Sequence, residues 1–388
     1  MRIFILGTGA SGSLLAHLLE RQGHTVWCGD RDPERARRFL GKKSKIEIKA
    51  VNARNLRAIV RAGRRCQLIV NATASVFNEI VMRAALRLRA HYLDLSAHMR
   101  RNPFRAEQFR YARRFEKKKR AAVINAGAAP GLTNLLVRRA ADALDHVESV
   151  HIRLYESTES DDPISQWSPE VSFDEAVSHP RIYRGGKFVL GKRFSEAETF
   201  RFAKPIGATR VFLAAQDEVG TLPHFIAMKE LDVKIGGNEI ERLRRWQRQG
   251  KLSRSRGMAR HRFPHTPTPR TVAKLIRRGV LQNARFAAAI LVRGVKKDRT
   301  LLIRTDCSFP TLYQIRQRGL FATPVAFVTA RVASQFIKFF PRDLGGVYAP
   351  EMLPEETRRA ILAGVHGQGG NLSTQTIRLK RREEEDEV

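Results

Sequence analysis

Three glycines with the spacing Gly7-x-Gly9-x-x-Gly12 are the residues of this chain best placed to do chemistry. They follow a short apolar run, residues 2–6, and precede leucines at helical spacing over residues 14–19. Glycines between a strand and a helix let the backbone approach a pyrophosphate, which the free N–H groups at the start of the helix then bind. We therefore expect the phosphates of a dinucleotide at Gly7, Thr8, Gly9, Ala10, Ser11 and Gly12. The alternative is a glycine-rich turn in an unrelated α/β domain.

Asp30 ends the next predicted strand, roughly 20 residues after the last glycine, where a carboxylate holds ribose hydroxyls. A carboxylate at this position favours NAD, because it repels a 2′-phosphate. Arg31 follows at once, and its guanidinium suits the 2′-phosphate of NADP. The expected cofactor is therefore NAD or NADP, with both choices open.

The elements that must position these residues alternate between strand and helix up to about residue 125. This alternation predicts a parallel sheet with helices on both faces, which binds ligands at the carboxyl ends of its strands. Three more polar motifs end predicted strands. We expect Asn71, Ala72, Thr73 and Asn125 to contact the cofactor, and Ser96 and Gly127 to contact the substrate. The alternative is that these residues only cap strands or helices.

Further candidates lie at a predicted helix start and in the second half of the chain. Pro130 and Gly131 begin a helix whose N-terminus could receive a carboxylate or an amide of the substrate. Trp167 could wall the pocket or belong to the core. Asp94 and Glu218 are the candidates for catalysis, but the catalytic acid or base stays unknown. An acidic group, which we interpret as a solvated turn although it could bind an amine, comprises Tyr155, Glu156, Glu159, Asp161 and Asp162.

The pattern changes after about residue 150, where strands are separated by irregular Pro, Gly and Ser stretches. This half is expected to be an α+β domain with a mixed sheet. Residues 323–340 are apolar and predict a buried helix, and residues 355–365 predict a final short helix. The fold class is therefore α/β, a dinucleotide-binding domain followed by an α+β domain.

Composition excludes several classes of protein. Hydrophobic residues make up 43% of the chain, enough for real cores and against wholesale disorder. There is no run of 18 apolar residues, so no membrane span is expected. Three dispersed cysteines show no metal-ligand spacing, so no metal site is expected, and they fit a cytoplasmic location.

The net charge of +33 raises the question of nucleic acid. Residues 31–65 and 83–120 carry much of the excess on predicted surface helices, one of them over residues 104–119, where cations form a solvated face. Residues 242–278 contain no Asp or Glu and predict a mobile basic surface excursion. The last stretch, 378–388, is a charged tail that we expect to fray. Few aromatic residues accompany these cations, which argues against a nucleic-acid partner.

Several motifs together resemble the saccharopine dehydrogenase-like family, which includes saccharopine reductase, lysine dehydrogenase and carboxynorspermidine dehydrogenase. They are the GTGASG turn, VNAT, HYLDLS, NAGAAPGLTN, the acidic element 217–223 and the segment 346–351. The resemblance implies a Rossmann domain over 1–132, an inserted domain over 133–320, and helices over 323–365 that return to the first domain. It also implies a homodimer.

The function predicted on this basis is an NAD(P)-dependent oxidoreductase. It would transfer a hydride at a C–N bond of an amino acid or polyamine-like substrate. Two alternatives stay open. One is a nucleotide-sensing protein that kept the fold and lost catalysis. The other is a nucleic-acid-associated protein that uses residues 242–278.

Overall fold

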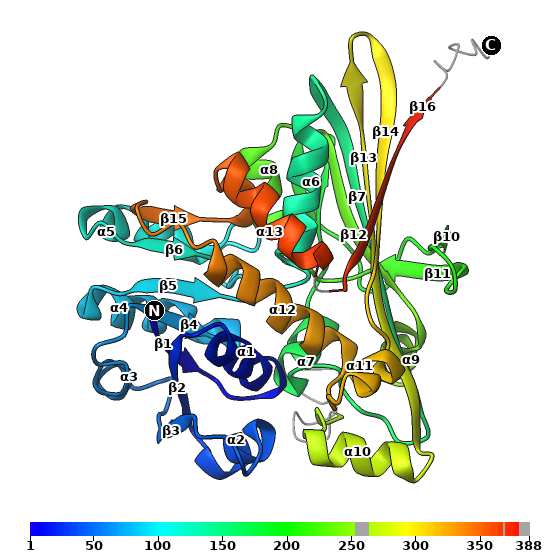
Figure 1. Ribbon diagram of the computed structural model, residues 1–388. Coiled ribbons are helices and arrows are strands. Elements are labelled where there is room, and N and C mark those ends of the chain that lie inside the picture. Colours follow the sequence, from blue (N-terminus) through cyan, green and yellow to red (C-terminus); the bar gives the residue numbers. More distant parts are fainter. Residues whose placement is uncertain (253–263, 368, 380–388) are drawn as a thin grey trace, which may run out of the picture.

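The computed structural model describes residues 1–252, 264–367 and 369–379. Its first sheet has seven parallel strands in the order β15-β6-β5-β4-β1-β2-β3 (Figure 1). This order, in which β1 lies between β2 and β4, is that of a doubly wound dinucleotide-binding sheet. The strands are β1 (Arg2–Leu6), β2 (Thr25–Asp30), β3 (Glu47–Ala50), β4 (Leu68–Asn71), β5 (His91–Asp94), β6 (Ala121–Val123) and β15 (Gly346–Tyr348).

Both faces of this sheet are buried because alternate residues of each strand face opposite ways. In β1, Ile3 and Ile5 join the core under α1 (Ala10–Arg21) and α12 (Pro324–Lys338). Phe4 and Leu6 join the core on the opposite face. The helices that cover that opposite face are α3 (Leu56–Ala62), α4 (Asn78–Leu88) and α5 (Ala112–Lys117), while α2 (Pro33–Leu40) follows β2.

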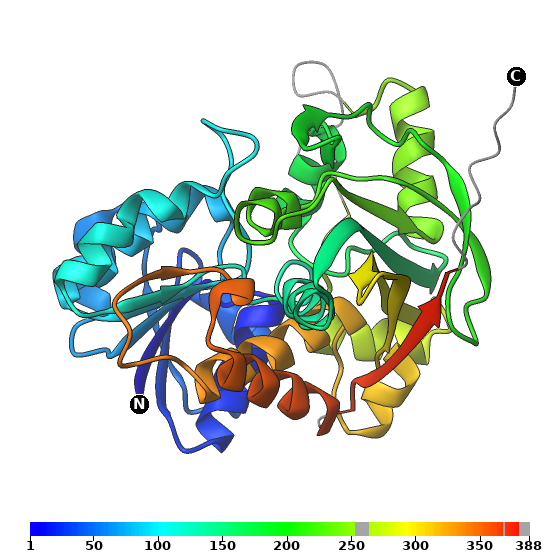
Figure 2. The ribbon, with the colours of Figure 1, turned by 90° about the horizontal axis from the view of Figure 1, so that it is seen from above.

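The second sheet is mixed and lies beside the first domain (Figures 1 and 2). Its main path is β10-β11-β12-β7-β13-β14-β16, in which only the β12–β7 pair is parallel. These strands are β7 (His146–Ser160), β10 (Glu198–Arg201), β11 (Ala208–Leu213), β12 (Glu230–Gly236), β13 (Leu281–Lys296), β14 (Arg299–Ser308) and β16 (Asn371–Arg378), with the hairpin β8 (Arg181–Arg184) and β9 (Lys187–Leu190) added at β12. The predicted fold class is confirmed.

Helices gather on one face of the second sheet, where the apolar core is continuous with that of the first domain. The predicted buried helix over 323–340 is confirmed, because α12 lies within this shared core. The other helices of this half are α6 (Leu132–Asp142), α7 (Pro169–Val177), α8 (Leu222–Phe225), α9 (Asn238–Arg248), α10 (Pro269–Arg277), α11 (Leu312–Gln317) and α13 (Glu355–Gly367).

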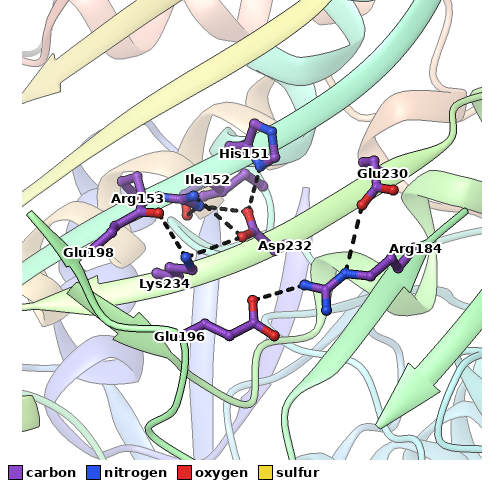
Figure 3. Close-up of polar contacts among 9 residues, drawn as sticks. All are labelled: His151, Ile152, Arg153, Arg184, Glu196, Glu198, Glu230, Asp232 and Lys234. Atoms are coloured by element: carbon purple, nitrogen blue, oxygen red, sulfur yellow. Dashed lines mark hydrogen bonds and ion pairs between the residues drawn. The ribbon is translucent and has the colours of Figure 1, made fainter. Parts of the chain in front are cut away.

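The opposite face of the second sheet carries a buried ionic cluster (Figure 3). Arg153 on β7 donates to Asp232 on β12 at 2.6 Å and to Glu198 on β10 at 2.5 Å. Lys234 contacts Glu198 at 2.7 Å, and His151 contacts Asp232 at 2.8 Å. Since the Arg153 and Lys234 side chains are only 5% and 7% exposed, this cluster joins three strands through paired, desolvated charges.

Four predictions about local structure were wrong in part. The helix expected over 104–119 is a 3-10 turn at Glu107–Tyr111 followed by the short α5, because Glu107 accepts from the backbone N–H groups of Arg100 and Arg101. The basic segment 242–278 is helical at both ends. Its first residues continue α9, and Pro269–Arg277 form α10, each with an apolar side packed on the protein; residues 253–263 lie outside the described part.

The other two corrections concern strands. Arg378, expected in a frayed tail, ends β16, which pairs along β14; residues 380–388 lie outside the description. Glu156, expected in a solvated turn, lies within β7 on the core side and is 6% exposed. Among the described residues, no helix combines the length and apolar character needed to cross a bilayer.

Candidate active site

The glycine turn joins the carboxyl end of β1 to α1. Gly7 has φ +96°, and a Cβ there would lie 2.7 Å from the backbone of Ala72. A Cβ on Gly12 would overlap the carbonyl oxygen of Gly7. Gly9 differs, because a Cβ on it would meet no atom within 4 Å, and it caps α1 with no side-chain hydrogen bond. The turn therefore leaves open space beside the first N–H groups of α1, which fits a bound phosphate.

Asp30 is held inside this turn at the carboxyl end of β2. Its Oδ2 accepts from the backbone N–H of Thr8 at 2.8 Å, and its Oδ1 accepts from that of Asp32 at 3.1 Å. The residue is 8% exposed. Arg31, in contrast, has an 81% exposed side chain whose nearest acid is Glu170 on α7, at 3.9 Å. This solvent-exposed ion pair thus lies beside the position expected for the adenosine ribose.

The ends of β4 and β5 are joined by an asparagine that sequence reasoning missed. Asn78, at the start of α4, accepts from Asn71 Nδ2 at 2.7 Å and donates to the carbonyl of Ser96 at 2.8 Å. Asn71 Oδ1 also accepts from the hydroxyl of Thr73 at 2.6 Å. The predicted contacts Asn71, Ala72, Thr73 and Ser96 are therefore brought to the same edge of the sheet as the glycine turn.

Asp94 is buried below this edge, held by three donors. Tyr92 Oη at 2.9 Å and Gln108 Nε2 at 3.0 Å bind its Oδ2, and the backbone N–H of Asn125 binds its Oδ1 at 2.8 Å. Burial raises the pKa of Asp94 to about 7. These contacts make Asp94 a group that positions Asn125. Sequence reasoning missed Gln108, which comes from the segment expected to be plain helix.

Asn125 follows β6 in a left-handed conformation, φ +59°, and its side chain is fully buried. Both its Oδ1 and its Nδ2 lack a hydrogen-bond partner among the described residues. Buried polar atoms are rarely left without partners, so a free amide at the carboxyl end of a strand fits a ligand with both a donor and an acceptor. The carboxamide of a nicotinamide is such a group.

Gly127, Pro130 and Gly131 form a tight loop at the start of α6. The Gly127 N–H donates to the carbonyl of Pro130 at 3.1 Å, and a Cβ on Gly131, φ +132°, would lie 2.6 Å from the Asn125 carbonyl oxygen. Asn134 closes the loop by accepting from the Gly131 N–H at 3.0 Å. The loop therefore lies directly against Asn125.

A buried polar network then joins three of the motifs that are far apart in the sequence. Asn134 Nδ2 donates to Thr221 Oγ1 and to Glu351 Oε2, each at 3.1 Å. Thr133 Oγ1 donates to Glu218 Oε1 at 2.8 Å. Burial raises the pKa of Glu218 to about 7, and its side chain is fully buried. Glu218 thus ties the acidic element to α6 in the interior.

A pocket of about 50 Å³ lies in the second domain, between α7, α9 and the strands β7 and β12. Trp167 lines this pocket, which agrees with the first of its two predicted roles, a wall of the pocket. Gln216 also lines it, and the next residue, Asp217, accepts from the backbone N–H of Ala97 in the loop after β5. The pocket therefore adjoins the carboxyl edge of the first sheet.

Several residues of this pocket were missed by sequence reasoning, although Glu156 had been noticed as part of an acidic group. Of the polar residues, only Glu156 could have been found from the sequence. The two-residue alternation of a strand places its side chain on the same face of β7 as Leu154, which is in the core. The missed polar residues are Ser165, Ser172, Glu175, Gln216 and Glu239. No group of His, Cys, Asp and Glu within the described ranges could hold a metal ion.

Comparison with known proteins agrees with this geometry. Residues 3–124 match the family described as "Saccharopine dehydrogenase NADP binding domain", which confirms the resemblance inferred from the motifs and an NAD(P)-binding first domain. The apo saccharopine dehydrogenase (L-Glu forming) of Saccharomyces cerevisiae has the same fold, with TM-score 0.70 and 12% identity over 97% of this chain and 99% of that one. A probable dehydrogenase of Thermotoga maritima aligns at TM-score 0.43 and 11% identity, over 97% and 98%.

Proposed function

We propose that this chain, whose residues 3–124 form a saccharopine dehydrogenase NADP-binding domain, is an NADP-dependent oxidoreductase acting at a C–N bond of an amino acid or polyamine-like substrate. One observation carries the proposal. The glycine turn has room for a phosphate, and Asn125, at the same edge of the first sheet, has a buried amide with no partner among the described residues. The pocket lined by Trp167 and Gln216 is linked to this edge where Asp217 accepts from the backbone of Ala97. That is the arrangement needed to hold a nicotinamide against a substrate carbon.

The turn would hold the pyrophosphate through the N–H groups of Ala10 and Ser11, with Gly9 giving the necessary room. We favour NADP over NAD because the family model that matches residues 3–124 describes an NADP-binding domain. Arg31 is exposed, and its ion pair with Glu170 at 3.9 Å lies in solvent, so its guanidinium could exchange this partner for a 2′-phosphate.

Asn125 would orient the nicotinamide carboxamide, since its two amide atoms lack partners and its backbone is fixed by Asp94. A bound nicotinamide accepts or supplies the hydride, so that oxidation of a CH–NH unit yields a C=N bond and one proton. Trp167 and α7 close the pocket side of the site and would keep water from the reacting carbon.

The proposal is tested with the purified full-length protein. Titration calorimetry should show NADPH binding more tightly than NADH. The absorbance of NADPH should then fall when carbonyl–amine pairs from an amino acid and polyamine panel are added. If neither nucleotide binds, the oxidoreductase is abandoned. Binding without turnover of any pair would instead support a nucleotide-sensing protein.

A further inference from the structure

The charge balance of the second-domain pocket has a consequence for the substrate. Three carboxyl side chains line it, from three different elements: Glu156 on β7, Glu175 on α7 and Glu239 on α9. Two cations, Arg193 and Arg242, line it as well. The question is which of these charges are free to meet a ligand.

Both arginines form contacts with other groups of the protein. Arg242 is paired with Glu239, donates to the carbonyl of Ile164 at 3.5 Å and lies over the Trp246 ring at 5.4 Å. Arg193 Nη1 donates to two backbone carbonyls, those of Ala176 and Leu252, each at 3.3 Å. Both guanidinium groups thus have partners in the protein, although Arg242 Nε is buried with none among the described residues.

Glu156 and Glu175 have no such partner. Within the described part of the chain, Glu156 has neither a hydrogen-bond donor nor an ion pair, although it is only 6% exposed. Burial and the nearby carboxyls Glu175 and Glu239 raise its pKa well above the usual range. Glu175 accepts a hydrogen bond from Gln216, and its nearest cation, Arg181, is paired with Asp217 at 3.7 Å. Two acids thus face the pocket without a counter-charge.

The remaining wall suits the hydrocarbon part of an amine. Leu213, Ile235 and Leu243 supply apolar surface, and Trp167 adds an aromatic ring. The Gln216 side of the pocket borders the loop after β5, through Asp217 and Ala97. A substrate could therefore place one amine in the pocket and extend its reacting C–N bond toward the edge where the nicotinamide is expected.

We propose that this pocket binds the ammonium group of a diamine or polyamine-type substrate between Glu156 and Glu175. The inference rests on the proposed function and narrows its substrate class. Two uncompensated carboxyls in a desolvated pocket attract a cation and repel an anion.

Binding of the ammonium group should also release a proton to the solvent. A carboxyl that is protonated in the empty pocket must release its proton when an ammonium group binds to it. The titratable and charged groups facing the cation are Glu156, Glu175, Glu239, Arg193 and Arg242. Only the first two lack a cation partner, so they are the source of the released proton.

The test uses the full-length protein and titration calorimetry with 1,4-diaminobutane, spermidine, lysine and glutamate, with and without NADPH. We expect the diamine and spermidine to bind, and their apparent enthalpy to change with the ionisation enthalpy of the buffer. Glu156→Gln should weaken diamine binding at least tenfold, because a charge-assisted hydrogen bond is lost without a change of shape. Its affinity for NADPH should stay unchanged.

Two further variants keep the test decisive. Glu175→Gln, on the half-buried α7, should weaken diamine binding similarly and covers the case in which the Glu156 variant does not fold. The control is Glu159→Gln on the same strand, where the side chain is 51% exposed and lies 3.7 Å from Arg285; it should bind diamine as the unmodified protein does. Glutamate binding as tightly as the diamine, or undiminished diamine binding by both Gln variants, overturns the inference.

Failure of this inference differs from failure of the proposed function. NADPH-dependent turnover without binding of the diamine would keep the oxidoreductase and overturn the amine pocket. Diamine binding with no nucleotide binding would keep the pocket and overturn the oxidoreductase.

Discussion

Alanine substitutions at Gly9 and Gly12 should affect different properties. Gly12→Ala should lower the stability of the fold, and Gly9→Ala should lower the affinity for the cofactor. A Cβ at Gly12 would overlap the carbonyl oxygen of Gly7, which belongs to the backbone and cannot rotate away. A Cβ at Gly9 would meet no atom within 4 Å, and the φ of −83° at Gly9 suits alanine. The first change disturbs the fold, and the second only fills the space that a phosphate would occupy.

The expected magnitudes follow from these contacts. Overpacking a rigid site costs about 1–3 kcal/mol, so Gly12→Ala should lower the melting temperature by several degrees. Gly9→Ala costs at most about 1 kcal/mol of stability, through a poorer helix cap. In the complex the same methyl group meets the pyrophosphate. A clash of about 1–3 kcal/mol there weakens NADPH binding about 5- to 150-fold.

Two measurements separate these effects, thermal unfolding of the unliganded variants and calorimetric titration of NADPH. We expect Gly9→Ala to melt near the unmodified protein and to bind NADPH weakly. The reasoning is refuted if Gly9→Ala binds NADPH with unchanged affinity. It is also refuted if Gly9→Ala loses as much thermal stability as Gly12→Ala.

Three other predictions concern buried polar groups. Glu218→Gln should flatten the fall in unfolding free energy between pH 5 and pH 8 in urea titrations. A carboxyl whose pKa is raised to about 7 stabilises the fold at low pH by at most about 3 kcal/mol and loses this as pH rises through 7. Asn134→Ala should lower the free energy of unfolding by about 2–4 kcal/mol in the same assay, because the buried Glu351 carboxyl loses the hydrogen bond from Asn134. An unchanged free energy would contradict the role of this hydrogen bond. Arg153→Leu should cost about 3–5 kcal/mol, while Arg184→Leu, 49% exposed on the same sheet, should cost under about 1 kcal/mol. Equal losses would show that burial does not decide the strength of these pairs.

The first sheet could be predicted because its signals are local. Each strand of the first half is a short apolar run, and the glycines, helix and acid follow in the required order. The strand β15 gave no such signal. It has three residues and exists because its backbone pairs with β6, far away in the sequence. Propensity within a short window cannot detect a strand that depends on a distant partner.

The polar residues of the candidate site divide in the same way. Asn71 and Asn125 could be found because they end strands, and ligands bind at that edge. Asn78 and Gln108 could not, since nothing in the sequence shows that their side chains reach across to a neighbouring loop. The strand β16 was missed for another reason. Its side chains are almost all exposed, so no apolar alternation marks it.

The late position of β15 in the chain affects how the protein is made. While a ribosome is synthesising the second sheet, β6 is the outer strand of the first sheet and its backbone groups on one side are unpaired. That edge is closed only when Gly346–Tyr348 leave the ribosome, so folding of the first domain is completed after the strands β7 to β14 of the second sheet have been made. A nascent chain paused before this point would present an open parallel edge to its neighbours.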